Sequence, residues 1–168
     1  MKYLTVIRHA KSSWKDTGCI DFDRQLSKRG TKDGPRMNAW LKKSHVSPDI
    51  VLCSPTVRAA ATLAMLTHLS ESAGETRVVE EIYEASLFDL LSLLGSVPDT
   101  FSHCCVIGHN PGLQELAQYL SDTPVEPLVT CAVVQLKLDV SSWEKIKVSC
   151  GTPVVFMTPK LLKDGNHA

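Results

Sequence analysis

No run of apolar residues in this sequence approaches the length of about 20 residues that a helix needs to cross a bilayer. At the N-terminus, Lys2 is followed by only five apolar or neutral residues before Arg8 and His9. That stretch is too short for the apolar core of a signal peptide. We therefore expect a protein that works in the cytoplasm and does not associate with a membrane.

The six cysteines lack any C-x-x-C spacing, whereas the ligands of a structural zinc site usually come in pairs two to four residues apart. Cys104 and Cys105 are adjacent, and in a strand their side chains would point to opposite faces. Without a secretion signal, the cysteines are expected to be reduced thiols packed as small apolar side chains. The sequence thus predicts neither a metal nor another cofactor.

The chain has no net charge, but its charges are unevenly distributed. Residues 1–58 carry 12 Lys and Arg against 5 Asp and Glu, and residues 59–168 carry 6 against 13. A basic segment of this kind can mark either a nucleic-acid surface or an anion site. Because it contains no lysine-rich tract and no interleaved aromatic residues, the sequence favours a compact anion site and no nucleic-acid partner.

The remaining sequence alternates between strand and helix patterns, without internal repeats, low-complexity segments or an evident linker, so residues 1–168 are expected to form one domain. The predicted strands are 2–8, 48–54, 76–83 and 103–110; the predicted helices are 26–44, 55–72, 86–97 and 111–121; residues 131–140 and 144–151 resemble a hairpin or meander. This order is typical of an α/β three-layer sandwich, a largely parallel central sheet with helices on both faces. The last strands are expected to add antiparallel edges.

Polar side chains follow each of the four predicted parallel strands. Arg8 and His9 end the first strand, and Arg58 follows the second. Glu84 follows the third strand and His109 the fourth. Because sheets of this class bind ligands at the carboxyl ends of their strands, we expect these five side chains to meet in one site.

Arg58 falls in the first turn of its predicted helix, after Ser54 as the cap and Pro55 at the first helical position. A cation there opposes the helix dipole, and an anion bound between Arg58 and the helix N-terminus would make the arrangement favourable. Asn110 and Pro111 repeat the pattern at the predicted helix 111–121, with Asn110 as the cap and Pro111 at the first helical position, which makes Asn110 a candidate for substrate binding.

Two guanidiniums and two helix ends suit a phosphoryl group, whose charge is spread over its equatorial oxygens. A histidine such as His9 can attack phosphorus and form a phosphoenzyme. Nearby arginines would lower its pKa and keep the imidazole neutral, while His109 stabilises charge on the phosphoryl oxygens. The predicted reaction is phosphoryl transfer to His9 followed by hydrolysis, without a metal.

These motifs resemble the histidine phosphatase, or phosphoglycerate mutase-like, superfamily, in the order Arg8-His9-Ala10, "SPTVRAAAT" and "VIGHNPG". "RHAKSSW", "LSKRG" and "IYEAS" are similar to its short SixA-like phosphohistidine phosphatase branch. The resemblance implies a phosphoglycerate mutase-like fold, His9 as the phosphorylated nucleophile, and a phosphate pocket formed by Arg8, Arg58 and His109. The sequence departs from the family pattern at Ala10, where the family has glycine, and at Lys15, where mutase-type members have asparagine.

Larger members of that superfamily carry a proton-donating glutamate on an insertion, and here Glu84 in the short segment "EIYEASL" is the nearest candidate. An imidazole leaving group, with a pKa near 6.5, needs a proton donor less than an alkoxide does. The expected substrate is therefore phosphohistidine on a protein, such as a histidine-containing phosphotransfer domain. Arg24 either reaches the substrate or pairs with Asp21 or Asp23.

Other functions compete with this interpretation. A phosphatase of small phosphomonoesters and a non-catalytic phosphoprotein-binding module both fit an anion site, and nucleic-acid binding fits least well. A cysteine phosphatase is rejected, because only four residues separate Cys53 from Arg58 where that chemistry requires five. The remaining histidines have no partner motif: His45, His68 and His103 are expected to be structural or exposed, and His167 to lie in a frayed tail.

Overall fold

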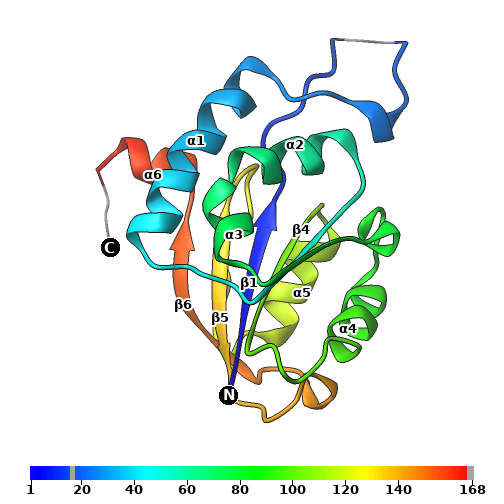
Figure 1. Ribbon diagram of the computed structural model, residues 1–168, viewed down its shortest axis with the longest axis vertical. Helices are drawn as coiled ribbons and strands as arrows, with labels where there is room; N and C mark the ends of the chain where they lie inside the picture. Colours follow the sequence, from blue (N-terminus) through cyan, green and yellow to red (C-terminus); the bar gives the residue numbers. More distant parts are fainter. Residues whose placement is uncertain (16–17, 166–168) are drawn as a thin grey trace.

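The computed structural model describes residues 1–15 and 18–165, so His167 lies outside the described residues. Six strands form one sheet in the order β3-β2-β4-β1-β5-β6 (Figure 1). The strands are β1 (Lys2–Arg8), β2 (Ile50–Cys53), β3 (Glu75–Val78), β4 (His103–Gly108), β5 (Val133–Leu138) and β6 (Gly151–Met157). The first four pair in parallel, while β5 and β6 add an antiparallel edge, as predicted.

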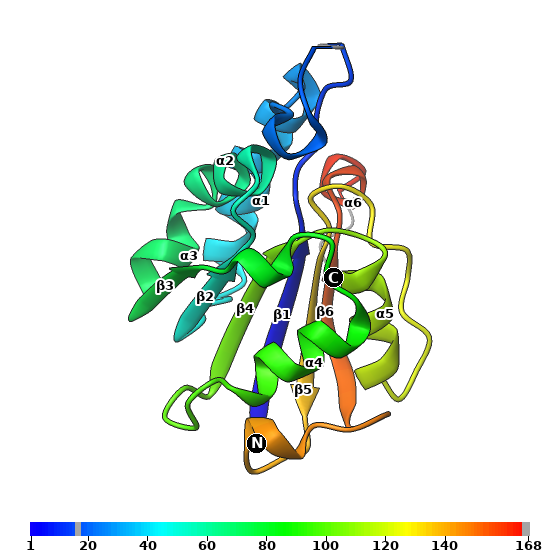
Figure 2. The ribbon, with the colours of Figure 1, turned by 90° about the vertical axis from the view of Figure 1, so that its right-hand side faces the viewer.

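Helices cover both faces of the sheet, which confirms the predicted three-layer α/β fold (Figure 2). One face carries α1 (Lys28–Lys43), α2 (Val57–Met65), α3 (Thr67–Ser72) and α6 (Pro159–Lys163), and the other carries α4 (Leu87–Gly95) and α5 (Gly112–Leu120). No helix among the described residues has the length and apolar character needed to span a bilayer.

Alternation along the strands supplies two apolar cores. In β1, Leu4 and Val6 pack with α4 and α5, whereas Ile7 packs with α1 and α2. Cys104 and Cys105 separate in the same way into the two cores, as their adjacency predicts. The cysteines at 53, 104, 105, 131 and 150 are buried thiols, in agreement with a packing role.

The predicted helix 55–72 is wrong in its continuity, because the chain breaks at Leu66 into α2 and α3. Leu66 is fully buried, and the side chain of Asn38 accepts a hydrogen bond from the backbone of His68 at the start of α3. The predicted cap is also wrong: Thr56, rather than Ser54, accepts from the backbone N–H of Ala59.

The predicted strand 144–151 is wrong, and β6 begins where that prediction ended. Trp143 is fully buried, and its backbone and indole N–H groups donate to Asp99 and Phe101, which holds the start of the segment off the sheet in a 3-10 turn. The third predicted strand, 76–83, is also shorter than expected: β3 stops at Val78, and residues 80–82 form another 3-10 turn. At residues 144–151, the tertiary hydrogen bonds of Trp143 override the local strand pattern.

Candidate active site

The carboxyl ends of the parallel strands open into a pocket of about 660 Å³. All seven residues proposed from the sequence line it: Arg8, His9, Arg24, Arg58, Glu84, His109 and Asn110. Trp14, Asp21 and Tyr83 also line it, together with Glu115 and neighbouring residues of α4 and α5. The structure therefore brings the predicted residues together, although they come from segments separated by up to about a hundred positions.

Strand register explains why the two histidines are neighbours. Arg8 pairs with Gly108 in the parallel β1–β4 ladder, so the residues that follow each strand, His9 and His109, emerge side by side. The backbone N–H of His9 donates to the carbonyl of Gly108 at 3.1 Å. The two imidazole centroids lie 5.1 Å apart with their planes 52° from each other.

His9 is held in one orientation by its own neighbour. Its Nδ1 lies 2.7 Å from the carbonyl oxygen of Ala10, which can only accept, so the neutral ring carries its proton on Nδ1 and a lone pair on Nε2. Burial, more than the charges of the surrounding arginines, lowers the pKa of His9 to about 4. The imidazole is neutral at pH 7, as predicted, although burial rather than arginine repulsion is the main cause.

His109 is anchored by hydroxyl groups at the end of β2. Its Nε2 lies 2.7 Å from Ser54 Oγ and 3.4 Å from Thr56 Oγ1, and both of these residues are fully buried. Burial, followed by the charges of His9 and Arg58, lowers the pKa of His109 to about 3. Ser54 was expected only as a helix cap, yet its position directly after β2 places it beside the pocket.

These two histidines predict a specific pH dependence of stability. The unfolded chain takes up their protons near pH 6.5, whereas the folded protein does so only near pH 4 and below. The contribution of the two histidines to the free energy of unfolding should therefore be fully present above pH 6.5. It should fall as the pH drops from 6.5 toward 4, by up to about 1.4 kcal/mol per pH unit for each histidine. Urea unfolding between pH 7.5 and 4.5 measures this slope. His9→Asn should flatten it, and an unchanged slope in that variant would contradict the assignment.

Arg8 and Asn110 share one anchor. Arg8 Nη1 and Asn110 Nδ2 each donate to the carbonyl oxygen of Leu128 at 3.0 Å. Asn110 is therefore not the cap of α5, as the sequence suggested, because that position is taken by Pro111 and the Asn110 amide turns toward the chain before β5. The carbonyl of Leu128 fixes Arg8 beside the two histidines.

Asp21 is a pocket residue whose importance the sequence did not show. Its carboxylate accepts from Arg58 Nη2 at 2.9 Å, from Arg24 Nε at 2.9 Å and from the Tyr83 hydroxyl at 3.1 Å, and its backbone carbonyl accepts from Arg58 Nη1 at 2.5 Å. Burial alone would raise the pKa of Asp21, but these partners outweigh it and hold that pKa below its usual range. The predicted pairing of Arg24 with Asp21 is confirmed, and Arg24 also lines the pocket.

Unused hydrogen-bonding capacity is concentrated in this pocket. Within the part of the chain that the structure describes, four buried side-chain atoms have no hydrogen-bond partner: Arg8 Nε, Arg58 Nε, His109 Nδ1 and Asn110 Oδ1. Buried polar groups are normally paired, and unpaired ones point to a functional site. All four belong to residues that line the pocket, and two of them are guanidinium donors suited to an anion.

Glu84 also lines the pocket, with an exposed side chain that has no ion-pair partner among the described residues. Its backbone lies in the left-handed region, at φ 55°, a conformation that a residue with a side chain adopts at some cost. The turn that carries it packs Tyr83 edge-on against the His109 ring at 5.8 Å. Glu84 is therefore placed at the pocket as predicted, on a constrained turn.

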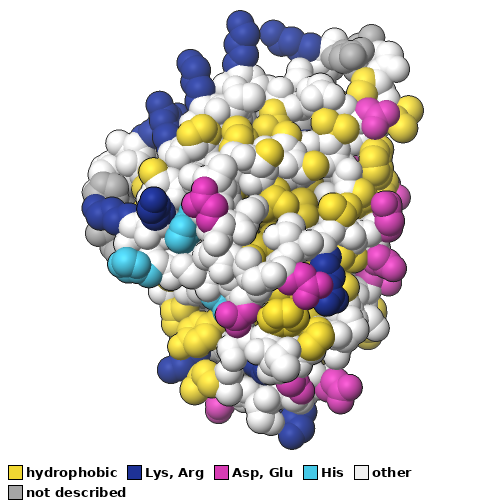
Figure 3. Space-filling view, viewed as in Figure 1, with side chains coloured by type: hydrophobic (Ala, Val, Ile, Leu, Met, Phe, Trp, Pro, Cys, Tyr) yellow, Lys and Arg dark blue, Asp and Glu magenta, His cyan; other side chains and the backbone are white. Residues whose placement is uncertain are grey.

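Charge separates across the molecule more broadly than a single anion site requires. Figure 3 shows Lys and Arg side chains along the upper left edge and Asp and Glu side chains down the right-hand edge. Of the cations in residues 1–58, Arg8, Arg24 and Arg58 line the pocket, whereas the six of α1 are exposed on its surface. Three of the Lys and Arg side chains in residues 1–58 thus belong to the predicted compact anion site, and six lie on the exposed surface of α1.

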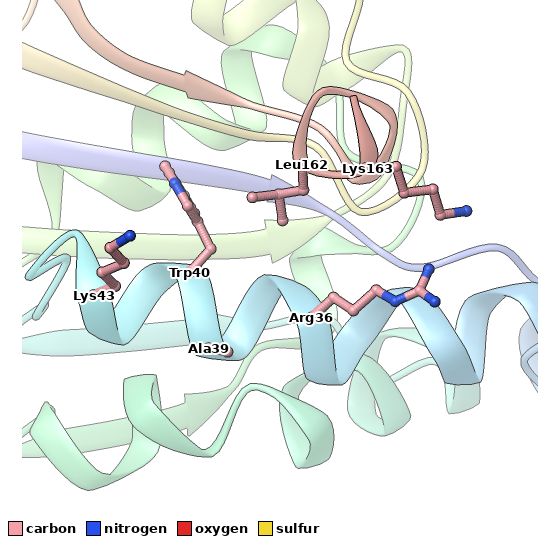
Figure 4. A pocket seen from close by; sticks show the side chains of 6 residues that line it. All are labelled: Arg36, Ala39, Trp40, Lys43, Leu162 and Lys163. Atoms are coloured by element: carbon pink, nitrogen blue, oxygen red, sulfur yellow. The ribbon is translucent and has the colours of Figure 1, made fainter. Parts of the chain in front are cut away.

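A second hollow of about 370 Å³ lies between α1 and α6 (Figure 4). It is lined by Arg36, Ala39, Trp40, Lys43, Leu162 and Lys163. These side chains provide cations and apolar surface but no imidazole, hydroxyl or carboxylate. The hollow thus lacks the pair of histidines and the unpaired guanidinium nitrogens found at the strand ends, and the pocket at the strand ends is the candidate active site.

Cys53 is not a candidate nucleophile. Cys53 is buried, and burial raises the pKa of its thiol to about 12, so it supplies no thiolate nucleophile at neutral pH. Among the described residues, no group of three or more His, Cys, Asp and Glu side chains is arranged to hold a metal ion.

Comparison with known proteins agrees with this geometry. Residues 4–90 match the family model for the histidine phosphatase superfamily (branch 1). "Uncharacterized protein Rv1276c" of Mycobacterium tuberculosis is 30% identical over 164 residues, which cover 92% of this chain and 100% of the relative. "Uncharacterized protein At3g52155, chloroplastic" of Arabidopsis thaliana is 31% identical over 152 residues, which cover 84% and 69%.

Solved structures show the same fold. The protein histidine phosphatase SixA complexed with tungstate superposes with a TM-score of 0.80 at 24% identity, covering 95% of this chain and 99% of that one. A protein from Nakamurella multipartitia, provisionally described as the phosphohistidine phosphatase SixA, gives a TM-score of 0.81 at 21% identity, covering 94% and 96%. The mycobacterial glucosyl-3-phosphoglycerate phosphatase Rv2419c gives 0.66 at 15%, covering 92% and 98%. The phosphoglycerate mutase-like fold is thereby confirmed.

Proposed function

The chain belongs to the histidine phosphatase superfamily, which supports a phosphatase activity, and we propose that its substrate is phosphohistidine on a protein. The reaction passes through a phosphohistidine intermediate at His9. One observation carries the proposal. The neutral His9 ring, with Nε2 available, has its centroid 5.1 Å from that of the His109 ring, and both histidines line one pocket with Arg8 and Arg58. A neutral imidazole has a free lone pair for attack on phosphorus, and the nearby guanidiniums can stabilise charge on the phosphoryl oxygens.

In the first step, Arg8 and Arg58 bind the phosphoryl oxygens, and Arg24 adds a third positive charge at the wall of the pocket. The lone pair of His9 Nε2 forms a bond to phosphorus, and the bond between phosphorus and the substrate nitrogen breaks. The substrate imidazole leaves with that electron pair and takes a proton from solvent or from a pocket residue. The hydrogen bond from His9 Nδ1–H to the Ala10 carbonyl stabilises the positive charge that develops on the ring.

In the second step, water attacks the phosphorus of the phosphoenzyme. The bond to Nε2 breaks, His9 regains its lone pair, and inorganic phosphate leaves. His109 is neutral and anchored by Ser54, so its ring can donate a hydrogen bond to a phosphoryl oxygen without adding a full charge. Residues fixed in advance in this way stabilise the transition state without reorganising during the reaction.

The proton donors around the pocket favour a nitrogen leaving group. Asp21 is paired with two arginines, and its lowered pKa keeps it ionised at neutral pH. Burial and the hydrogen bond to Asp21 raise the pKa of Tyr83, which makes it a weak acid. An imidazole nitrogen leaves without a strong acid, whereas an alkoxide does not.

The proposal is tested with a phosphotransfer domain that has been phosphorylated on histidine by phosphoramidate. Its turnover is compared with that of 3-phosphoglycerate and glycerol 3-phosphate, two esters whose alkoxide leaving groups need a proton donor. We expect kcat/KM to be higher for the phosphorylated domain by about a hundredfold or more. An ester loses the rate gain that a general acid would supply to its alkoxide leaving group, whereas an imidazole leaving group does not need it. Equal or greater turnover of an ester would contradict the proposal.

Glu84 supports a second candidate function, hydrolysis of small phosphomonoesters, because it is a carboxyl group at the pocket that could protonate an alkoxide. Glu84→Gln separates the two functions. If the esters are the substrates, this change should lower their kcat/KM by about a hundredfold, because the general acid is lost. If phosphohistidine is the substrate, its turnover should stay within about threefold of the original.

A further inference from the structure

Large apolar side chains exposed to solvent lie in, or next to, the segments that line the active-site pocket. Trp14 lines the pocket and is 70% exposed. Ile20, 67% exposed, directly precedes the pocket residue Asp21, and Phe88, 80% exposed, lies two positions beyond the pocket residue Ser86. We call Trp14, Ile20 and Phe88 the apolar rim. In Figure 2, the segment before α1 and the start of α4, which carry them, lie on the side that faces the viewer.

The fold does not require Phe88 to be apolar, and the Trp14 ring stacks on Arg24, whose guanidinium carbon lies 3.6 Å from the ring centroid. In α4 the buried face consists of Leu90 and Leu94, whereas Phe88 points away from that core and is the most exposed of the large apolar side chains. Single exposed apolar residues are common, but a group of them beside a functional pocket marks an interaction surface. Aromatic side chains such as Trp14 and Phe88 are the type that dominates binding energy at protein interfaces.

Charge around the pocket indicates what the bound surface carries. Glu84 and Glu115 are exposed carboxylates at the pocket wall, and neither has an ion-pair partner among the described residues. The pocket also contains the guanidiniums of Arg8 and Arg58. A complementary ligand therefore combines a phosphoryl group with neighbouring cationic side chains.

We propose that the apolar rim is the docking surface for the phosphorylated partner protein, whose face around the phosphohistidine is apolar and carries a Lys or Arg opposite Glu84 and Glu115. This inference rests on the proposed function. Trp14 lines the pocket, and Ile20 and Phe88 lie one and two positions from residues that line it, so the body that bears the phosphoryl group comes next to these side chains when phosphorus reaches His9. A sugar phosphate is too small to cover all three side chains at once, whereas a protein face can cover them.

Two variants test the rim without touching the pocket: Phe88→Ser and Ile20→Ser. Both sites are largely exposed, so the substitutions should leave the free energy of unfolding nearly unchanged. The matched controls are Val148→Ser and Val154→Ser, which replace exposed valines before and within β6. The two probes are free phosphohistidine and a phosphotransfer domain phosphorylated with phosphoramidate.

We expect the unmodified protein to prefer the phosphorylated domain over free phosphohistidine. Each rim variant should lower kcat/KM for the domain by about tenfold, mainly through KM, as loss of an interface hot spot does. Turnover of free phosphohistidine by the rim variants should stay within about twofold, because these substitutions leave the pocket residues unchanged. Both control variants should turn over both substrates as the unmodified protein does.

The outcomes separate the two proposals. Equal effects of the rim variants on both probes, or no effect on the domain, would overturn the docking surface while leaving the proposed function intact. Efficient turnover of free phosphohistidine with no preference for the domain would do the same. If the unmodified protein cleaves neither probe, the proposed function fails and the docking inference fails with it.

Discussion

His9→Asn should lower kcat/KM by at least about 10⁴-fold, the scale of loss seen when a nucleophile is removed. Asparagine is the informative replacement, because its amide N–H₂ can take the place of Nδ1–H and donate to the Ala10 carbonyl, while nothing replaces Nε2. The variant should therefore keep the local hydrogen bond and lose only the lone pair. Steady-state rates and rapid-quench labelling with ³²P-labelled substrate measure both consequences.

The label distinguishes catalysis from binding. Phosphohistidine survives alkali and is lost in acid, so the unmodified protein should show an alkali-stable, acid-labile label that His9→Asn lacks. The matched control is His103→Asn. Burial lowers the pKa of this histidine too, but it begins β4 at the opposite end from the pocket and contacts Thr5. It should label normally. An unmodified protein that binds the phosphorylated domain but never labels would be a binding module instead.

The core of the candidate site was predictable because sheet topology carries the information. Parallel strands end at a common edge, so the residues after β1, β2 and β4 had to approach one another once the strands were recognised. The prediction needed only the order of strands and helices. It placed Arg8, His9, Arg58 and His109 in one pocket without any knowledge of side-chain contacts.

Asp21 shows where that reasoning stops. It lies in the connection between β1 and α1, whose path follows no periodic pattern that a sequence can reveal. Its role depends on meeting Arg58 and Tyr83, which are 37 and 62 positions away. Acidic residues in loops are usually solvated, so composition gave no reason to distinguish Asp21 from Asp23.

The errors in the fold have the same origin. The alternating pattern of 144–151 suits a strand, but the buried indole of Trp143 is fixed by the carbonyl of Phe101, and this contact decides the path of the chain. Likewise, α2 and α3 share a helix-forming sequence, and the contact from Asn38 to His68 ends one helix and begins the next. Long-range contacts of this kind lie beyond local propensity.

Arg58→Ala should lower kcat/KM by about 10² to 10³, the cost of removing one donor that stabilises a transition-state oxyanion. Arg58 is 4% exposed, lines the pocket, and keeps its Nε without a partner while both terminal nitrogens donate to Asp21. The loss should appear in both kcat and KM, because the guanidinium contacts the phosphoryl group in the ground state and the transition state. The control Arg77→Ala removes an exposed arginine paired with Glu75 at the edge strand β3, and it should leave turnover unchanged.

Asp21→Asn decides whether Asp21 acts through Arg58. Asp21 accepts from both terminal nitrogens of the guanidinium and leaves Nε without a partner, so loss of its charge should release Arg58 and lower kcat/KM by about tenfold. In the double variant with Arg58→Ala, the asparagine should cost nothing more, because the group that it positions is gone. Asp23 lies in the same 3-10 turn as Asp21, which spans Asp21–Asp23, and Asp23→Asn should leave turnover unchanged. Additive losses in the double variant would instead show that the Asp21 carboxylate meets the substrate directly, and the positioning role would be wrong.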